Sequence, residues 1–360
     1  MLRLERDNAH VRDARIAFNE KDHFYTVDSR RVVGSVSSLW ASYFSSFDAQ
    51  GTALRLVRRW GEREPPTDQT QGQDPHQWNW RYAYKYERLV EKKTHDAAVS
   101  ALSEVGCPSF QFEHDEKGYA RFFWYLRNRG LRQAEERALA LTKLWNSLGT
   151  SASERGTYIH RQCELHCNDE SFDRTVETEQ YLRFREDHPW LKPYRTEWSV
   201  FAYARGGAHV VAGQIDGLYV DERTGKYEMI DYKVTAHELN EDNPYRKFGK
   251  YPFHDLVDNA YGHYCVQQQV YRYILETEYG MKVERCRLLR LHDTICSYQL
   301  VDVKDLRDKI EIVFKQCAEK KAMNVVRNAK VSWRRLAVFF RAYGILRAAS
   351  RATKKRKIFN

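Results

Sequence analysis

A pair of alternating apolar runs joined by a polar turn, residues 211–234, constrains the fold of this chain more than any other segment. The turn at 223–226 contains a glycine, which favours a β-hairpin between the runs. The first run carries Asp216, the second carries Asp231, and Lys233 follows two positions later. Side chains two residues apart on a strand share a face, so Asp231 and Lys233 should lie side by side. The hairpin would bring Asp216 to the same end of the sheet.

Two carboxylates and a lysine at one point suit a divalent metal ion and an attacking water. Mg²⁺ usually takes one or two carboxylates together with waters and substrate phosphates. Asp216 and Asp231 would supply the carboxylates, and the backbone carbonyl of Tyr232 could add an oxygen. Lys233 would stabilise negative charge on a scissile phosphate. The alternative is a surface hairpin in which Asp231 and Lys233 only pair with each other. An isoleucine precedes each acid, however, and acids in apolar strands are costly unless paired or metal-bound.

A histidine upstream of the hairpin is a candidate metal ligand. Residues 156–167 predict a helix that begins after the polar run 151–155, and they place His160 and Glu164 on one helix face. A neutral histidine binds a metal through one ring nitrogen while a partner holds the other. The alternative is that His160 is an ordinary half-buried helix residue.

Three more polar residues are candidates for the same site. Glu197 lies in an alternating run that predicts the strand before the hairpin, and it is either a third acid at the metal or a solvent-facing residue. Gln267 and Tyr271 lie one turn apart on a helix predicted at 259–279, with Gly280 as its C-cap. An amide can orient a lysine or a phosphate, and a phenol can donate to a phosphate. A plain amphipathic helix is the alternative for this pair.

In their order along the chain, these segments resemble the PD-(D/E)xK nuclease superfamily, specifically its RecB-like exonuclease branch. The resemblance covers residues 152–292 and rests on five pieces: Gly156–His160 continuing to Glu164, Glu197 within 196–200, Gly213–Asp216, Ile230–Lys233, and Gln267 with Tyr271. A lead-in at His23–Val27 is similar to one that precedes RecB-like nuclease domains of large DNA viruses and related elements. The resemblance implies an α/β fold with a central mixed β-sheet flanked by helices, a restriction-endonuclease-like core with helical additions.

The resemblance also implies roles for the candidate residues. His160, Asp216, Asp231 and the Tyr232 carbonyl would hold one or two Mg²⁺ or Mn²⁺ ions, and Lys233 would be catalytic. Gln267 and Tyr271 would lie near the site and the DNA, although the pair Gln269 and Tyr273 fits the same spacing. The implied activity is metal-dependent hydrolysis of DNA phosphodiester bonds, as an exonuclease in repair, recombination or replication. The alternatives are a structure-specific or partner-dependent endonuclease of a virus or mobile element, and an inactive DNA-binding module.

The composition favours a polyanionic partner. Lys and Arg outnumber Asp and Glu by 59 to 49, a net charge of +10, and 23 Tyr with 9 Trp suit stacking on unpaired bases. DNA, single-stranded or at duplex ends, is the expected partner, with a protein of a replication or recombination complex as a further one. No run of 18 apolar residues predicts a membrane span. Seven cysteines in no disulfide-like spacing, and no visible signal peptide, predict an intracellular protein.

Three regions are predicted along the chain. Residues 1–150 form an N-terminal β-hairpin and helical region, 151–330 the nuclease core, and 331–360 a basic C-terminal helix and tail. The cluster Lys354–Lys357 in that tail is a nuclear localisation patch, a non-specific DNA grip or a solvated end, and the sequence leaves all three open.

Overall fold

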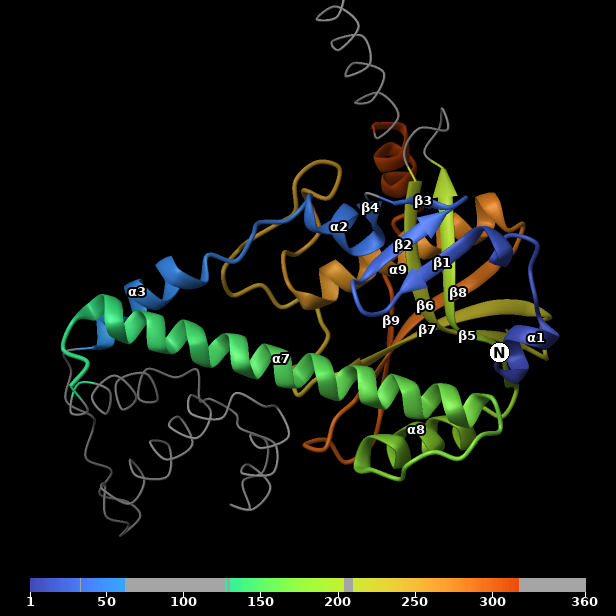
Figure 1. Ribbon diagram of the computed structural model, residues 1–360, viewed down its shortest axis with the longest axis horizontal. Coiled ribbons are helices and arrows are strands. Elements are labelled where there is room, and N and C mark those ends of the chain that lie inside the picture. Colours follow the sequence, from blue (N-terminus) through green and yellow to red (C-terminus); the bar gives the residue numbers. More distant parts are fainter. Residues whose placement is uncertain (33, 62–126, 128–129, 204–209, 317–360) are drawn as a thin grey trace, which may run out of the picture.

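The computed structural model describes residues 1–32, 34–61, 127, 130–203 and 210–316 of the chain. Within them the fold is mixed α/β, with a mixed sheet between helices (Figure 1). The charged and aromatic composition of residues 78–105 favours a helical insertion there, and this segment and the predicted basic tail at 331–360 lie outside the described residues. None of the helices in these ranges is long and apolar enough to cross a membrane.

The central sheet has six strands in the order β4–β6–β7–β8–β9, with β5 paired to β6. The strands are β4 (Gly34–Ser35), β5 (Leu191–Tyr203), β6 (Val210–Asp221), β7 (Lys226–Val234), β8 (Val283–Leu291) and β9 (Gln299–Asp302). β4 pairs with β6, and β7 with β8, in parallel, whereas the other pairs are antiparallel. The predicted α/β class with a mixed sheet is therefore confirmed.

The hairpin between β6 and β7 forms as predicted. Its turn closes through the amide of Gly225, which donates to the Asp221 carbonyl at 2.7 Å. Gly225 has a φ of +67°, a left-handed conformation that glycine adopts without the strain a Cβ would cause. The pairing runs from Asp221 opposite Lys226 only as far as Gly217 opposite Ile230. Beyond that point β7 continues along β8 while β6 pairs with β4, so the two hairpin strands diverge.

Helices cover both faces of this sheet because its strands alternate apolar side chains between two cores. One core joins Leu218, Met229 and Leu288 to α9 (Ala260–Glu278). The other takes the next residue of each strand, Tyr219, Ile230 and Leu289, and packs them against α7 (Ala134–Cys167) and α8 (Val176–Asp187). The strand period of two residues therefore produces a three-layer arrangement (Figure 1).

The sequence favours a helical pattern at 121–146 that leads into the helix bearing His160, and the structure joins the two into one helix. The prediction that it starts after residues 151–155 is wrong, because α7 begins at Ala134 and continues unbroken to Cys167. Its first half packs Leu141 and Leu144 on α3 (Ala49–Trp60), and its second half packs Ile159 and Cys163 on the sheet. The polar run spans the gap between these two cores, where exposed polar side chains cost a helix little.

The N-terminal region forms the predicted hairpin and extends it. Its elements are α1 (Arg3–Asp7), the 3₁₀ helix η1 (Asp13–Arg15), β1 (Ile16–Asn19), β2 (Phe24–Val27), β3 (Arg30–Arg31) and α2 (Val36–Ala41). A reciprocal capping box between Ser35 and Ser38 starts α2. Downstream, the sequence favours strands at 283–292 and 297–303 and an amphipathic helix at 305–324. The structure has β8 and β9 there, and residues 307–316 are helical.

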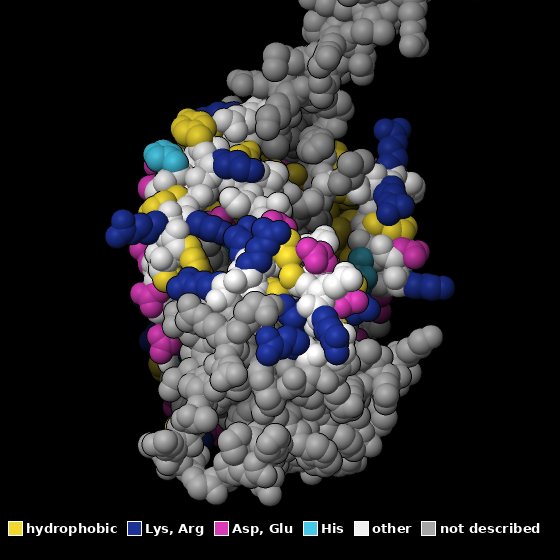
Figure 2. Space-filling view, turned by 90° about the vertical axis from the view of Figure 1, so that its left-hand side faces the viewer, with side chains coloured by type: hydrophobic (Ala, Val, Ile, Leu, Met, Phe, Trp, Pro, Cys, Tyr) yellow, Lys and Arg dark blue, Asp and Glu magenta, His cyan; other side chains and the backbone are white. Residues whose placement is uncertain are grey.

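A long loop, residues 235–259, connects β7 to α9. It lies between α2 and α7 on the left of Figure 1. Figure 2 views the molecule from that side and shows Lys and Arg side chains across the middle of the face, beside hydrophobic side chains.

Candidate metal centre

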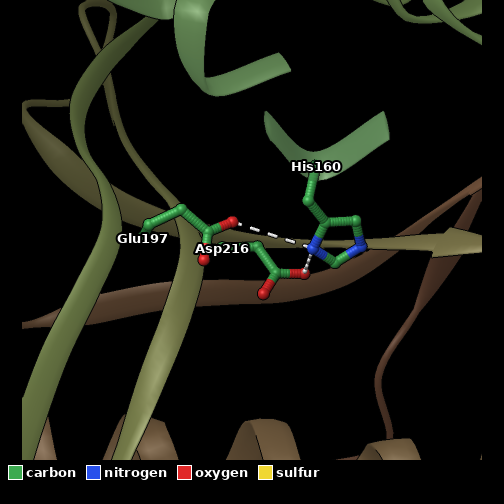
Figure 3. Close-up of side chains that lie close together, drawn as sticks. All are labelled: His160, Glu197 and Asp216. Atoms are coloured by element: carbon green, nitrogen blue, oxygen red, sulfur yellow. Dashed lines mark ion pairs between the residues drawn. The ribbon is translucent and has the colours of Figure 1, made fainter. Parts of the chain in front are cut away.

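Three side chains from different elements converge where β6 and β7 diverge. His160 comes from α7, Glu197 from β5 and Asp216 from β6, and one possible ligand atom of each lies within 4.8 Å of the others. His160 Nδ1 is 3.5 Å from Asp216 Oδ2 and 3.7 Å from Glu197 Oε1 (Figure 3). Among the described residues this is the one such group of three or more His, Cys, Asp or Glu side chains.

The diverging strands explain how the histidine is oriented. Tyr232 lies beyond the last β6–β7 residue pair. Its backbone amide and carbonyl therefore hydrogen-bond to the side chains of Asp216 and His160 instead of to a strand. Its amide donates to Asp216 Oδ2 at 2.8 Å, and its carbonyl accepts from His160 Nε2 at 2.8 Å. Because Nε2 carries the hydrogen, neutral His160 has its lone pair on Nδ1, the atom that faces the carboxylates. The Tyr232 carbonyl, which we expected at the metal, is thus an acceptor for His160.

Glu197 is itself one of the three residues of this group, and its side chain is 22% exposed. Its Oε1 is buried and has no hydrogen-bond partner in the structure. Its backbone has a φ of +44° in the middle of a strand, and the Gln214 amide donates to its carbonyl at 2.9 Å. Left-handed backbone at a non-glycine residue is strained and concentrates at functional sites. An orphaned buried carboxylate oxygen is the kind of atom that a cation would satisfy.

Asp231 and Lys233 form a buried pair next to this group. Lys233 Nζ lies 2.7 Å from Asp231 Oδ2, with the two side chains 15% and 2% exposed. Gln268 Nε2 donates to the other carboxylate oxygen at 2.8 Å, and Lys233 Nζ sits 4.3 Å from the centre of the Tyr264 ring. Asp231 is therefore held by its neighbours and lies outside the three-residue group, whereas Asp216 lies within it.

The helix α9 contributes a residue that the spacing did not select. Gln268 donates to Asp231, whereas Gln267, favoured in the sequence, acts on Tyr271, whose pKa it lowers against the larger effect of burial. Tyr271 is buried and electrostatically coupled to Asp216 and Asp231. It fits because Gly213 has no side chain, since a Cβ there would lie 2.6 Å from the Tyr271 ring.

Tyr25 of β2 is a second residue that the analysis of the hairpin did not bring to the site. Burial raises the pKa of Tyr25 to about 12, and the nearby charges of Glu197 and Asp216 add to this rise. Tyr25 belongs to the motif His23–Val27. The sequence therefore drew attention to this segment, but it did not predict that Tyr25 lies near Glu197 and Asp216.

Burial or nearby charges raise the pKa values of His160, Asp231 and Lys233. Burial alone would lower the pKa of His160, but Asp216 and Glu197 outweigh it and raise the pKa to about 9. Burial raises the pKa of Asp231 to about 6 against the opposing effect of Lys233. Burial would lower the pKa of Lys233, but Asp231 and Asp216 raise it above the ordinary lysine value. Lys233 is consequently an ammonium at neutral pH.

A polar cavity of about 240 Å³ lies beside Glu197, on the side of the N-terminal elements. Its lining includes Phe18 of β1, Glu164 of α7 and Trp198 of β5. Of the three residues His160, Glu197 and Asp216, only Glu197 lines this cavity.

Comparison with known proteins gives no family assignment. No protein-family model and no curated protein match the chain. Solved structures do match, and one is titled "Crystal structure of SSO0001". The match spans 41% of this chain and 57% of that one, at 13% identity and a TM-score of 0.23. A TM-score this low carries no argument, and the site must be judged on its own geometry.

Proposed function

We propose that this chain is a divalent-metal-dependent deoxyribonuclease with a restriction-endonuclease-like core, acting as an exonuclease on DNA ends or single strands. The observation that carries the proposal is the arrangement of side chains at the point where β6 and β7 diverge. It sets a His–Glu–Asp group next to a buried Asp–Lys pair, with His160 Nδ1 oriented toward two carboxylates. The net charge of +10 suits a polyanionic substrate.

The side chains of the group fit a divalent cation such as Mg²⁺ or Mn²⁺. Carboxylate oxygens are the protein ligands these ions prefer, and Mn²⁺ also accepts imidazole. Glu197 Oε1 is buried and lies 3.7 Å from His160 Nδ1, beyond hydrogen-bond distance, so a bound ion would give this oxygen a closer partner. Glu197, Asp216 and His160 Nδ1 would hold it. When bound, the ion would polarise a phosphoryl oxygen and acidify a water.

The remaining side chains have distinct roles in the proposed hydrolysis. Lys233 is a cation at neutral pH, so it stabilises charge on the phosphate rather than removing a proton from water. Asp231 fixes the position of the ammonium and is itself fixed by Gln268. Tyr232 orients His160 through its carbonyl and Asp216 through its amide. These contacts preorganise the site before substrate binds.

The test is cleavage of end-labelled linear DNA, single- and double-stranded, beside a closed circle, in Mg²⁺, Mn²⁺ or EDTA. Metal-dependent loss of the linear DNA alone is the expected result. Lys233→Ala and Asp231→Ala should abolish cleavage while leaving DNA affinity largely intact, because the basic surface supplies most non-specific binding. Lys192→Gln removes an exposed lysine of β5 and serves as the charge control.

Other outcomes would redirect or overturn the proposal. Nicking of the circle would favour the endonuclease alternative. Absence of cleavage with DNA binding retained would favour an inactive or partner-dependent module. Equal loss of binding and cleavage in folded Lys233→Ala would contradict the role given to Lys233.

A further inference from the structure

The loop between β7 and α9 exposes an unusual set of aromatic side chains. Tyr245, Phe248 and Tyr251 are 81%, 49% and 61% exposed. Single exposed apolar side chains are common on proteins, but clusters of them mark interaction sites. These three fall within residues 245–251, in the middle of the loop sequence, and the Lys247 carbonyl there accepts from the Asp258 amide at 2.9 Å, next to the N-cap of α9.

Cations separate the three rings. Arg246, Lys247 and Lys250 occupy positions between them and are exposed. Lys247 Nζ lies 6.0 Å from the centre of the Tyr245 ring, and Lys250 Nζ donates to the Ser42 carbonyl at 3.3 Å. Among the described residues, no carboxylate forms an ion pair with Arg246 or Lys247.

Three of the five carboxylates of the same loop contact side chains outside it, whereas Glu238 and Asp242 accept from the Asn240 amide within it. Glu241 pairs with Lys304 at 3.0 Å, and Asp258 with His263 at 2.8 Å. Asp255 pairs with Lys309. The loop is therefore acidic where it is anchored and positively charged at residues 245–251.

This part of the loop is held in one conformation. Asn243 accepts from the Lys247 amide at 2.9 Å and donates to its carbonyl at 2.6 Å. The Lys250 amide donates to the Tyr43 carbonyl at 2.7 Å, and buried Phe253 stacks on Phe44 with ring centres 6.3 Å apart. A surface fixed in advance loses little entropy when a ligand binds.

The loop is also connected directly to the candidate site. It begins two residues after Lys233 and ends at Asn259, the N-cap of the helix that carries Tyr264 and Gln268. Those two side chains contact Lys233 and Asp231. The loop therefore connects β7, which carries Lys233, to α9, whose Tyr264 contacts that lysine.

We propose that residues 245–251 form a binding surface for an unpaired nucleic-acid strand. Bases stack on Tyr245, Phe248 and Tyr251, while phosphates contact the three cations between them. A duplex offers phosphates but keeps its bases stacked inside, so the exposed rings select single strands. The face seen in Figure 2 carries the same mixture of cationic and hydrophobic side chains. The choice of nucleic acid as ligand rests on the proposed function.

The test measures binding without cleavage. Fluorescence anisotropy of the full chain in EDTA compares a labelled 20-nucleotide oligothymidine with a blunt duplex of equal length. Tyr245→Ala and Tyr251→Ala should each weaken single-strand binding roughly 5- to 150-fold, the range that corresponds to loss of one base–aromatic stack. Tyr245→Phe and Tyr251→Phe keep the ring and should bind as the unmodified chain does.

Charge and stacking can be separated in the same assay. The double variant Arg246→Gln, Lys247→Gln should lower the slope of log affinity against log salt by about 1.4, at about 0.7 for each phosphate contact on a single strand. Lys192→Gln on β5 should leave the slope unchanged. Unchanged single-strand affinity in both alanine variants would overturn the proposal, as would equal affinity for single strand and duplex.

The outcomes distinguish this proposal from the nuclease proposal. Loss of binding in the alanine variants supports the surface even if no metal restores cleavage in the unmodified chain. Cleavage that depends on Lys233, with unchanged binding by the alanine variants, keeps the nuclease and removes the surface.

Discussion

Binding of a metal ion at the His160 site should release one proton. Burial would lower the pKa of His160, but Asp216 and Glu197 raise it to about 9, so the imidazole is doubly protonated at pH 7. A metal ion needs the lone pair on Nδ1. The Nε2 hydrogen is donated to the Tyr232 carbonyl, so the proton that leaves is the one on Nδ1.

The size of the effect follows from this pKa. Below a pKa of about 9, affinity should fall about tenfold, or about 1.36 kcal/mol, for each pH unit. Affinity for Mn²⁺ at pH 7 should therefore be roughly 100-fold weaker than its high-pH limit. Burial also raises the pKa of the Asp216 carboxyl, so the part of the slope that belongs to His160 is the part that His160→Gln removes.

Calorimetry can count the released proton. Mn²⁺ titrations at pH 7 in two buffers with different protonation enthalpies should give close to one proton per ion. In His160→Gln the count should fall toward zero, and the remaining affinity should lose the part of its pH dependence that His160 supplies. A count near zero in the unmodified chain, or the same count in both proteins, would refute this account of the site.

The same pKa predicts how the stability of the protein depends on pH in EDTA. A folded-state pKa raised from 6.5 to about 9 gives stability that is complete below pH 6.5 and is lost as pH rises through 9. The difference amounts to about 3 kcal/mol at most, at 1.36 kcal/mol per pKa unit. Urea unfolding should show this loss in the unmodified chain and not in His160→Gln; a rise in stability over the same range would reverse the sign and contradict the assignment.

Urea unfolding at pH 7 tests three further predictions about the packing of the site. Gly213→Ala should cost about 1–3 kcal/mol because its Cβ would lie 2.6 Å from the Tyr271 ring. Gly156→Ala should instead stabilise the protein by about 0.5–1 kcal/mol, since its Cβ would meet nothing within 4 Å inside helix α7. Gln268→Leu should cost about 1–3 kcal/mol because it removes the donor to buried Asp231. Unchanged stability in Gly213→Ala, or a loss in Gly156→Ala, would contradict the geometry at that glycine.

Local patterns predicted the hairpin and the helices that carry the candidate residues. The strands β6 and β7 follow from a period of two residues and a glycine turn, and α9 follows from its helical period and from Asn259 and Gly280 at its ends. These signals depend only on residues that are close together in the sequence, so they can be recognised without knowledge of the fold. The face of β7 was also predicted, since Asp231 and Lys233 do lie together.

Contacts between distant segments were beyond the same reasoning. Gln267, Gln268 and Gln269 point in directions about 100° apart around the helix, and only the packing of α9 selects Gln268 for Asp231. The continuity of α7 through residues 151–155 depends on α3, a separate element that covers its first half. The parallel pairing of Gly34 with Val211 joins segments that no local pattern relates.

The position of Glu197 depends on the N-terminal segment as well as on the sheet. Strained backbone of this kind costs of order 1–3 kcal/mol and persists only where its surroundings enforce it. Asp13 of η1 provides such enforcement: it accepts from Arg195 at 2.7 Å and from Trp198 Nε1 at 2.8 Å, on either side of Glu197. Arg195 is 4% exposed, so its charge has to be paired. Asp13 therefore fixes β5 on both flanks of the strained residue, and the N-terminal segment is part of what holds the candidate metal centre in shape.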